Sequence, residues 1–146
     1  MKEATAEIEI NASAERVWQV VSDFSRYPQW NPLVPRLKCD KRVGARGRGL
    51  LGTGGKLMMP FFPKIVVFDP NSELGWVGEA PIPGIFKGDH RFIIEPLSET
   101  SCRLRHRETF TGVVANMFGD SIVKLACNMY VDYNRELKLR AEQVPV

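Results

Sequence analysis

The sequence predicts an α+β domain in which a seven-stranded curved antiparallel sheet wraps around one long C-terminal helix, with two short helices after the first strand. Three observations lead to this prediction. The segment from about Phe118 to Glu142 repeats its apolar residues with the period of a helix. The chain before Gly112 alternates apolar and polar residues with the period of a strand, apart from one short helical stretch. The apolar face of the long helix is also wider than that of an ordinary surface helix, so a broad sheet is needed to cover it.

Length and composition indicate one globular domain over residues 1–146. A chain of 146 residues with 44% hydrophobic and 25% charged residues is large enough to bury a core or to enclose a cavity. The net charge of +3 is too small to indicate nucleic-acid binding. No segment is long and apolar enough for a signal peptide or a spanning helix, so we expect a cytoplasmic protein without integral membrane association.

The N-terminal third is predicted to contain one strand and two short helices. Glu3 to Ile10 alternates small or apolar residues with charged ones, as in a strand with one buried face. Asn11 or Ser13 can cap the helix that follows, because both side chains accept hydrogen bonds from backbone N–H groups. The segment from Asp23 to Pro35 contains three prolines and is predicted to form a second helical turn and then a tethered loop. The first helix repeats its apolar residues at helical spacing: Val17, Val20, Val21 and Phe24.

The middle of the chain is predicted to form six strands that follow one another in a meander. Residues 36–111 have a period of two, and glycines and prolines separate the segments. The apolar run at Met58, Met59, Phe61 and Phe62 lies beside prolines and is interpreted as a bend that either caps a cavity or forms an exposed contact patch.

A glycine motif in this region matches a nucleotide-binding pattern by its letters alone. Gly47 to Gly52 satisfies G-x-G-x-x-G, but the dinucleotide fingerprint also requires a buried strand before the motif and a helix that begins inside it. The preceding segment is strongly charged, and Gly54 and Pro60 follow too soon for a helix. We therefore predict that these glycines let a strand bend.

The long C-terminal helix is predicted to present a wide apolar face to the sheet. Advancing 100° per residue places most apolar side chains on one side and the charged ones on the other. The residues of the predicted face are Phe118, Ile122, Leu125, Ala126, Met129, Tyr133 and Leu137, with Tyr130 and Ala141 at its edge.

The hairpin from Gly88 to Thr111 carries the candidate functional residues. Its second strand places three arginines on one face, and these have to face water because unpaired guanidinium groups are costly to bury. The opposite face, with His106 and Glu108, therefore points inward. A turn near Ser98 to Thr100 pairs residues whose numbers sum to about 198, which places His90 opposite Glu108, Phe92 opposite His106, and Glu95 opposite Arg103.

Three interpretations of this polar group remain open. His90 and Glu108 can satisfy each other in an inert core. The group can orient the polar end of a ligand. Alternatively, His90 or Glu108 can act as an acid or base in catalysis.

The sequence predicts neither a cofactor nor a metal site. It contains no serine elbow, no H-E-x-x-H motif and no clustered carboxylates, and its three cysteines, Cys39, Cys102 and Cys127, are too far apart for a zinc spacing.

The order of several short motifs resembles the SRPBCC superfamily, which includes START lipid-transfer, birch-pollen-allergen and polyketide cyclase/dehydrase families. The resemblance covers nearly the whole chain and is closest to the polyketide cyclase/dehydrase-like branch. It rests on residues 11–18 (NASAERVW), 23–24, 27–32 (YPQWNP), 74–76 (LGW), 88–92 (GDHRF), 106–108 (HRE) with Phe110 and Gly112, and Asn134 with 137–138.

The resemblance implies a helix-grip fold with an apolar cavity between sheet and helix that binds a small hydrophobic ligand such as a lipid, a polyketide or an aromatic metabolite. Polyketide cyclase or dehydratase chemistry with His90 or Glu108 as acid or base is the alternative, and no catalytic signature decides it. By strand and helix parity, the expected ligand-binding residues are Trp30 near the mouth, Trp76, His90, Phe92, Ile94, His106, Glu108, Phe110, Met129 and Tyr133. A third possibility is an interaction module that docks a protein through Arg103, Arg105 and Arg107 or through residues 58–62.

Overall fold

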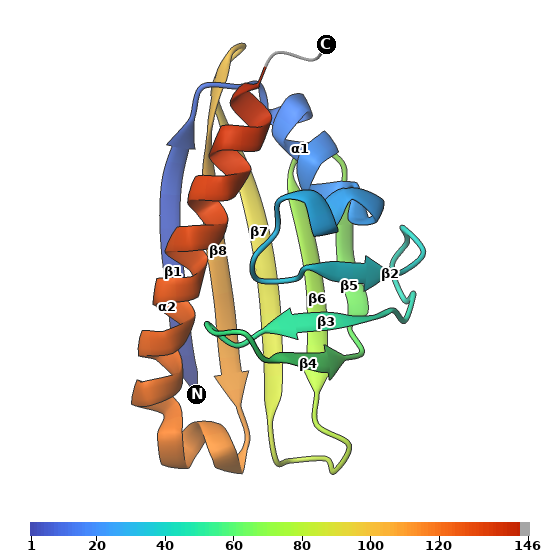
Figure 1. Ribbon diagram of the computed structural model, residues 1–146, viewed down its shortest axis with the longest axis vertical. Helices are drawn as coiled ribbons and strands as arrows, with labels where there is room; N and C mark the ends of the chain where they lie inside the picture. The colour runs from blue at the N-terminus through green and yellow to red at the C-terminus, as the bar shows by residue number, and fades with distance from the viewer. Residues whose placement is uncertain (144–146) are drawn as a thin grey trace.

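The computed structural model describes residues 1–143 and has the α+β architecture that the sequence predicts (Figure 1). A large antiparallel sheet covers one side of a long helix, and a smaller sheet lies beside the same helix. The elements in chain order are β1 (Lys2–Ile10), α1 (Ala14–Ser22), the 3-10 helix η1 (Phe24–Gln29), β2 (Arg36–Lys38), β3 (Arg48–Gly52), β4 (Met58–Phe61), β5 (Lys64–Asp69), β6 (Glu73–Glu79), β7 (Lys87–Ser98), β8 (Ser101–Thr111) and α2 (Val113–Glu142).

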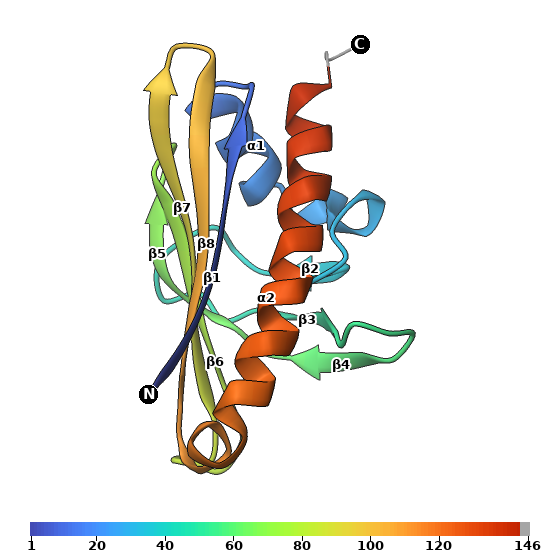
Figure 2. The ribbon, with the colours of Figure 1, turned by 90° about the vertical axis from the view of Figure 1, so that its left-hand side faces the viewer.

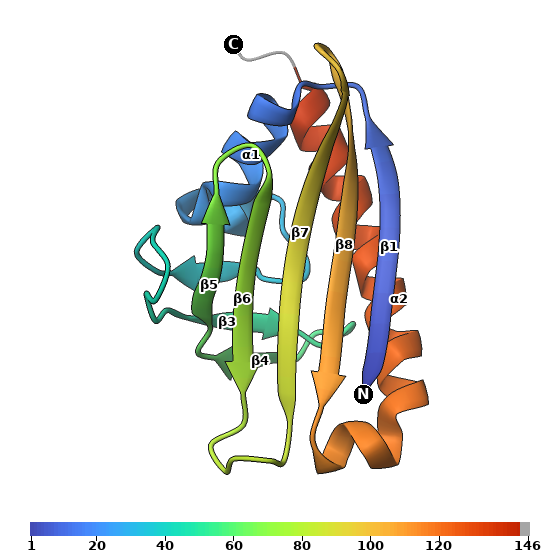
Figure 3. The ribbon, with the colours of Figure 1, turned by 180° about the vertical axis from the view of Figure 1, so that it is seen from behind.

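The large sheet has five strands in the order β1-β8-β7-β6-β5, and each adjacent pair is antiparallel (Figure 3). The β7–β8 hairpin has the predicted register, with His90 opposite Glu108 and Phe92 opposite His106. The outward arginines of β8 are half-exposed and pair with glutamates of β1, for example Arg105 Nε with Glu7 Oε1 at 2.8 Å. These ion pairs account for the charged outer face of the hairpin.

The remaining strands form a separate three-stranded sheet in the order β2-β3-β4, so residues 1–143 contain eight strands in two sheets and not seven in one. This small sheet crosses β5 and β6 at a steep angle in Figure 1. The segment before β3 joins the two sheets: Arg46 forms a bridge with Lys64, and the Gly47 N–H donates to the carbonyl oxygen of Pro63 at 2.8 Å. The chain changes from one sheet to the other between β4 and β5, where Pro63 interrupts the strand pairing.

The apolar run at residues 58–62 is a strand over most of its length, which corrects the prediction of a bend. Pro60 lies opposite Leu50 in the β3–β4 pair. Because β4 is an edge strand, a proline is tolerated within it. Met58, Met59 and Phe62 are each exposed by half or more, so they form an apolar rim at this edge.

The glycine motif within residues 47–52 contributes to strand β3 and to no helix, as predicted. An added Cβ at Gly52 would lie 2.5 Å from the carbonyl oxygen of Pro32. The loop after η1 therefore packs directly on this strand, and glycine is required at that point for steric reasons.

Helix α2 packs on the inner face of the large sheet, and the β3–β4 hairpin lies beside it over the same face (Figure 1 and Figure 2). Phe118 has non-helical angles (φ −123°, ψ 16°) that kink the helix. The predicted apolar face is correct from Ala126 onward, but Phe118 and Leu125 are exposed by 57% and 51%. The kink changes the phase of the first turns, so that small residues, Ala115 and Gly119, face the sheet there.

Both predicted short helices are present. The side chain of Ser13 caps α1 by accepting a hydrogen bond from the Arg16 N–H at 3.1 Å. The helix η1 follows directly, and its Tyr27 hydroxyl donates to the carbonyl oxygen of Val21. These helices close one end of the space between the large sheet and α2.

Candidate functional site

Two buried imidazoles lie at the centre of the inner face of the large sheet. His90 of β7 and His106 of β8 are exposed by only 4% and 0%, and their Nε2 atoms share a hydrogen bond. A hydrogen bond between two imidazoles requires one of them to donate and the other to accept. The groups that contact the two Nδ1 atoms therefore determine which imidazole donates and which accepts.

On one side of the pair, helix α2 supplies Asn134. Its Oδ1 lies 3.2 Å from His106 Nδ1, and its Nδ2 donates to the carbonyl oxygen of Ala6 in β1 at 3.3 Å. Asn134 is 2% exposed, so this amide connects the helix, β8 and β1 inside the core. Hydrophobic periodicity misses Asn134, because a polar residue on the buried face of a helix looks like a break in the apolar pattern.

On the other side of the pair lies the carboxyl group of Glu108. Its Oε1 is 3.4 Å from His90 Nδ1 and also accepts a hydrogen bond from the Tyr130 hydroxyl of α2. The side chain of Glu108 is 17% exposed, so this end of the row of polar contacts is only partly buried. The structure thus places the predicted pair His90 and Glu108 together and adds Tyr130, which the sequence analysis assigned only to the helix edge.

Burial determines the protonation preferences in this group. Desolvation raises the pKa of Glu108 from 4.5 to about 7, against the hydrogen bond from Tyr130, which lowers it. Desolvation lowers the pKa of His90 from 6.5 to about 3 and the pKa of His106 well below 6.5. Desolvation, followed by the charge of Glu108, raises the pKa of Tyr130 above its ordinary value. The group therefore favours neutral imidazoles and a carboxyl group poised near neutral pH.

Aromatic rings enclose the two imidazoles. The ring of Tyr130 stacks on His106 with centroids 3.9 Å apart, and the ring of Phe92 stacks on His90 at 4.7 Å. Trp76 of β6 lies 5.6 Å from His90. This apolar wall excludes water from the imidazoles and accounts for the strong desolvation.

Beside Glu108 the inner face of the sheet has no side chains at two paired positions, Gly78 of β6 and Gly88 of β7. An added Cβ at Gly88 would lie 2.3 Å from Glu108 Oε2, so that oxygen rests on the glycine. An added Cβ at Gly78 would meet nothing within 4 Å, so the space above Gly78 is open. The two residues form what we call the glycine floor, which a scan for motifs passes over because isolated glycines carry no spacing signal.

Tyr133 is fully buried between Phe92 and Trp30, with centroid distances of 5.2 and 5.3 Å. Among residues 1–143 its hydroxyl has no hydrogen-bond partner. A buried hydroxyl without a partner costs about 1–3 kcal/mol, and this group is free to bond a polar atom of a bound molecule.

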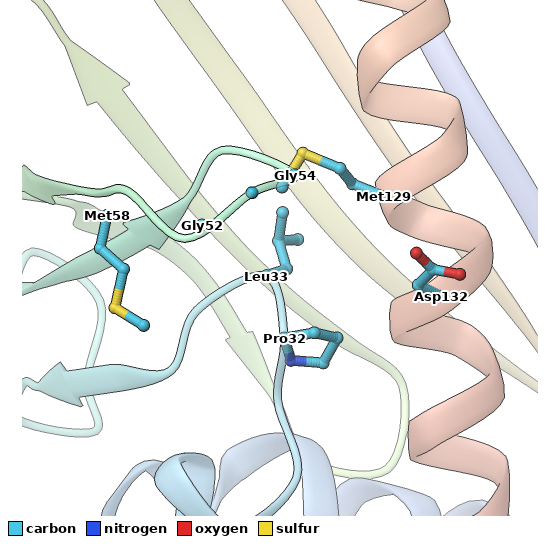
Figure 4. Close-up of a pocket in the computed structure, with 8 residues that line it drawn as sticks. Pro32, Leu33, Gly52, Gly54, Met58, Met129 and Asp132 are labelled. Atoms are coloured by element: carbon cyan, nitrogen blue, oxygen red, sulfur yellow. The ribbon is translucent and has the colours of Figure 1, made fainter.

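Two hollows lie beside this core: one between the loop after η1, the β3–β4 hairpin and α2, and one between the end of η1 with its loop and α2. The first has a volume of about 220 Å³, and Figure 4 shows Met129 reaching across it toward Gly54 above Leu33. The second is an open groove of about 440 Å³ lined by Trp30 and by Asp132, which also lines the first.

The predicted ligand-binding residues thus occupy three places. Met129 and Trp30 line the hollows. Ile94 and Phe110 are buried on the inner face above and below the histidines, at 4% exposure each. The others meet around the imidazole pair: Trp76, His90, Phe92, His106, Glu108 and Tyr133.

The amino-acid sequence matches the family described as polyketide cyclase / dehydrase and lipid transport over residues 1–142. The chain belongs to this family. Membership confirms the resemblance to the SRPBCC superfamily and to its polyketide cyclase/dehydrase-like branch. A search of curated proteins gave no match.

Solved structures share the fold of this family member over nearly its whole length. A START superfamily protein from Mycobacterium smegmatis superposes with a TM-score of 0.81 at 25% identity, with 99% of this chain and 100% of that one covered. The Zhui aromatase/cyclase from Streptomyces sp. R1128 gives 0.76 at 13% identity, with 97% and 93% covered. The di-domain ARO/CYC BexL from the BE-7585A biosynthetic pathway gives 0.76 at 17% identity, with 98% of this chain covered and 48% of BexL, so the chain spans about half of that protein.

Among the described residues, no helix is long and apolar enough to cross a membrane.

Proposed function

We propose that this protein binds a small hydrophobic ligand between the large sheet and α2, with its polar end at Glu108. The observation that carries the proposal is the position of this carboxyl group. It lies at the partly exposed end of a row of buried polar groups, next to the open space above Gly78, and aromatic rings surround the imidazoles beside it. Ligand sites in proteins commonly combine an apolar wall with a few fixed polar groups in this way.

An apolar rim supports the same proposal. The β3–β4 hairpin exposes Leu57, Met58 and Met59, and α2 exposes Leu125 under the hairpin tip, each by half or more. Exposed apolar groups gathered around an opening are typical of binding sites. The hollow between Met58 and Met129 measures about 220 Å³, below the roughly 300–1,000 Å³ of sites for drug-sized ligands. A ligand larger than a few rings therefore requires the hairpin side chains to move.

The experiment adds side chains of increasing size at Gly78 of the glycine floor. Gly78→Ala, Gly78→Val and Gly78→Leu add these side chains at a position where nothing lies within 4 Å of an added Cβ, so we expect the variants to fold. We expect the affinity for an apolar fluorescent probe to fall in that order while the thermal midpoint stays the same or rises, because glycine weakens a strand. Unchanged probe affinity in the folded Gly78→Leu variant would place the ligand elsewhere.

The position of the Trp76 and Phe92 rings in the wall allows a second measurement. Replacement of Trp76 by a polar residue removes the largest ring beside His90 and should weaken probe binding. Equal affinity in a folded variant contradicts this placement.

A second candidate function, catalysis of a cyclase or dehydratase type, has one observation in its favour. The pKa of Glu108 is raised to about 7, where a carboxyl group both gives and takes a proton at working pH. Zhui and BexL are named aromatase/cyclases and share the fold. This function requires a turnover that depends on pH near 7 and is abolished by Glu108→Gln in a folded protein. Loss of stability without turnover in the wild type would leave binding as the function.

A further inference from the structure

We infer that the site selects neutral apolar ligands that carry a hydroxyl group, and that this hydroxyl donates a hydrogen bond to Oε2 of Glu108. The inference rests on the ligand-binding function proposed above and adds the chemical class of the ligand. It follows from the order of protons along the hydrogen bonds from Ala6 to His90 and from the contact of His90 with Glu108.

The order begins at the backbone. The carbonyl oxygen of Ala6 only accepts, so the Asn134 atom that faces it is the Nδ2 donor and the atom that faces His106 is the Oδ1 acceptor. His106 Nδ1 therefore carries a hydrogen and donates it at 3.2 Å. In a neutral imidazole the other nitrogen, Nε2, is then an acceptor.

The next bond fixes the second imidazole. Because His106 Nε2 accepts, His90 Nε2 donates in the bond between the two rings. A neutral His90 then has a bare Nδ1, and this atom faces Glu108 Oε1 at 3.4 Å. Two acceptors facing each other would repel, so one proton lies between these two atoms.

Whether Glu108 or His90 carries that proton, the same carboxyl oxygen, Oε2, is left to bind a ligand. Either Glu108 Oε1 carries it and donates to His90, or His90 carries it and the carboxylate accepts. Oε1 also accepts from the Tyr130 hydroxyl. In each arrangement Oε2, which rests on Gly88, has no proton and is an acceptor. The group that Glu108 offers to a ligand is therefore an acceptor, and the ligand has to supply a donor.

The charges around Glu108 exclude anionic head groups. Among the described residues its one ion-pair partner is His90, and the negative charge of Asp89 raises its pKa further. Arg91 and Arg107 lie on the outer face, where they pair with Glu73 and Glu3, and Lys2 Nζ pairs with Asp120 at 3.0 Å. A carboxylate or phosphate brought to Oε2 would meet negative charge without a cation to balance it, which is costly in a desolvated site.

The test compares three fluorescent probes of nearly equal size: 2-naphthol, 2-methoxynaphthalene and 2-naphthoate. We expect the wild-type protein at pH 7 to bind 2-naphthol about tenfold more tightly than 2-methoxynaphthalene, which lacks the donor, and 2-naphthoate least tightly. In Glu108→Met, which keeps the length of the side chain without the oxygens, 2-naphthol and 2-methoxynaphthalene should bind equally.

The outcomes distinguish a failure of the hydroxyl preference from a failure of the proposed ligand-binding function. Equal binding of 2-naphthol and 2-methoxynaphthalene by the wild type, or tightest binding of 2-naphthoate, overturns the preference for a hydroxyl and leaves hydrophobic binding intact. Failure of all three probes to bind contradicts the proposed function itself. The wild-type comparison is decisive even if Glu108→Met does not fold.

The proton order is testable without any ligand. The sequence contains two histidines, so their ¹⁵N resonances are assigned by deleting one ring at a time. At pH 7.5 we expect His106 as the Nδ1–H tautomer and His90 with a hydrogen on Nε2. A His106 ring protonated on Nε2 alone would reverse the order and overturn the assignment of Oε2 as an acceptor.

Discussion

Gly88 of β7 supports the carboxyl group of Glu108 from the neighbouring strand, and a Cβ at Gly88 would come within 2.3 Å of Oε2. A side chain at this position would require the carboxyl group to shift. The contact fixes the distance between the carboxyl group and the sheet, and it holds Oε1 in reach of both His90 and Tyr130. The backbone of Gly88 and the carboxyl group of Glu108 thus form one structural unit.

The first prediction tests this unit. Gly88→Ala should displace the carboxyl group and lower the free energy of unfolding by about 1–3 kcal/mol, as overpacking does elsewhere. In a Glu108→Ala background the same change has nothing to clash with and should cost close to nothing. Urea unfolding of the four proteins gives the coupling energy between the two sites. Additive effects of the two substitutions would contradict the steric account.

The second prediction concerns the stability of the fold at low pH. Burial lowers the pKa of His90 to about 3 and that of His106 well below 6.5, so below pH 6.5 the unfolded chain binds protons that the folded protein does not. Stability should therefore fall as the pH decreases, by about 1.4 kcal/mol per pH unit for each group. Glu108 acts in the opposite direction between pH 7 and 4.5, because its pKa is raised to about 7 by burial and by Asp89, against the hydrogen bond from Tyr130.

Unfolding in urea between pH 4 and 8 measures the balance of these groups. With two histidines against one carboxyl group, we expect a net loss of stability from pH 6.5 downward and a steeper loss below about pH 4.5, where the contribution of Glu108 ends. His90→Gln, which removes one buried imidazole, should give a shallower slope than the wild type. A free energy of unfolding that stays constant or increases as the pH decreases from 6.5 to 4.5 would show that the folded protein does not keep both histidines uncharged.

The sequence predicts the inner hairpin well because physical constraints determine it completely. Arginines on one face of β8 have to face water, which turns His106 and Glu108 inward, and a short turn after β7 fixes which residues lie opposite each other. Register and side-chain direction follow from those two facts. The pairing of His90 with Glu108 was therefore predictable without knowledge of any other strand.

Other features were not predictable from periodicity. A period of two identifies a strand but does not say which strands pair, so the small sheet β2-β3-β4 was merged with the large one. The kink at Phe118 changes the phase of α2 by backbone angles that leave no mark on the apolar pattern. Asn134 is polar on a buried face, and only the carbonyl of Ala6 and the ring of His106 explain it.

The third prediction concerns the buried hydroxyl of Tyr133. The group has no hydrogen-bond partner among the described residues, so its burial is costly. Tyr133→Phe keeps the ring between Trp30 and Phe92 and removes only that cost, and we expect the free energy of unfolding to rise by about 1 kcal/mol. Tyr130→Phe is the matched control on the same helix, since it removes a hydrogen bond to Glu108 and should destabilise the protein. Destabilisation by both substitutions to a similar degree would indicate that the Tyr133 hydroxyl is bonded.

The fourth prediction concerns the way into the site. Leu125 of α2 is 51% exposed, and its Cδ1 would lie 3.3 Å from a Cβ on Gly54 at the tip of the β3–β4 hairpin. This leucine therefore packs under the hairpin tip beside the hollow that Met129 lines. Leu125→Ser should leave stability within about 0.5 kcal/mol, as for other surface positions, but should weaken the binding of an apolar probe several-fold.

Leu139 provides the matched control for this change. It is 55% exposed near the other end of the same helix, so Leu139→Ser carries the same loss of apolar area and helix propensity without a place at the rim. Fluorescence titration of both variants with one probe separates a local role at the entrance from a general effect on the helix. If the rim admits the ligand, only Leu125→Ser weakens binding; equal affinities for the two variants would mean that the ligand reaches Glu108 by another path.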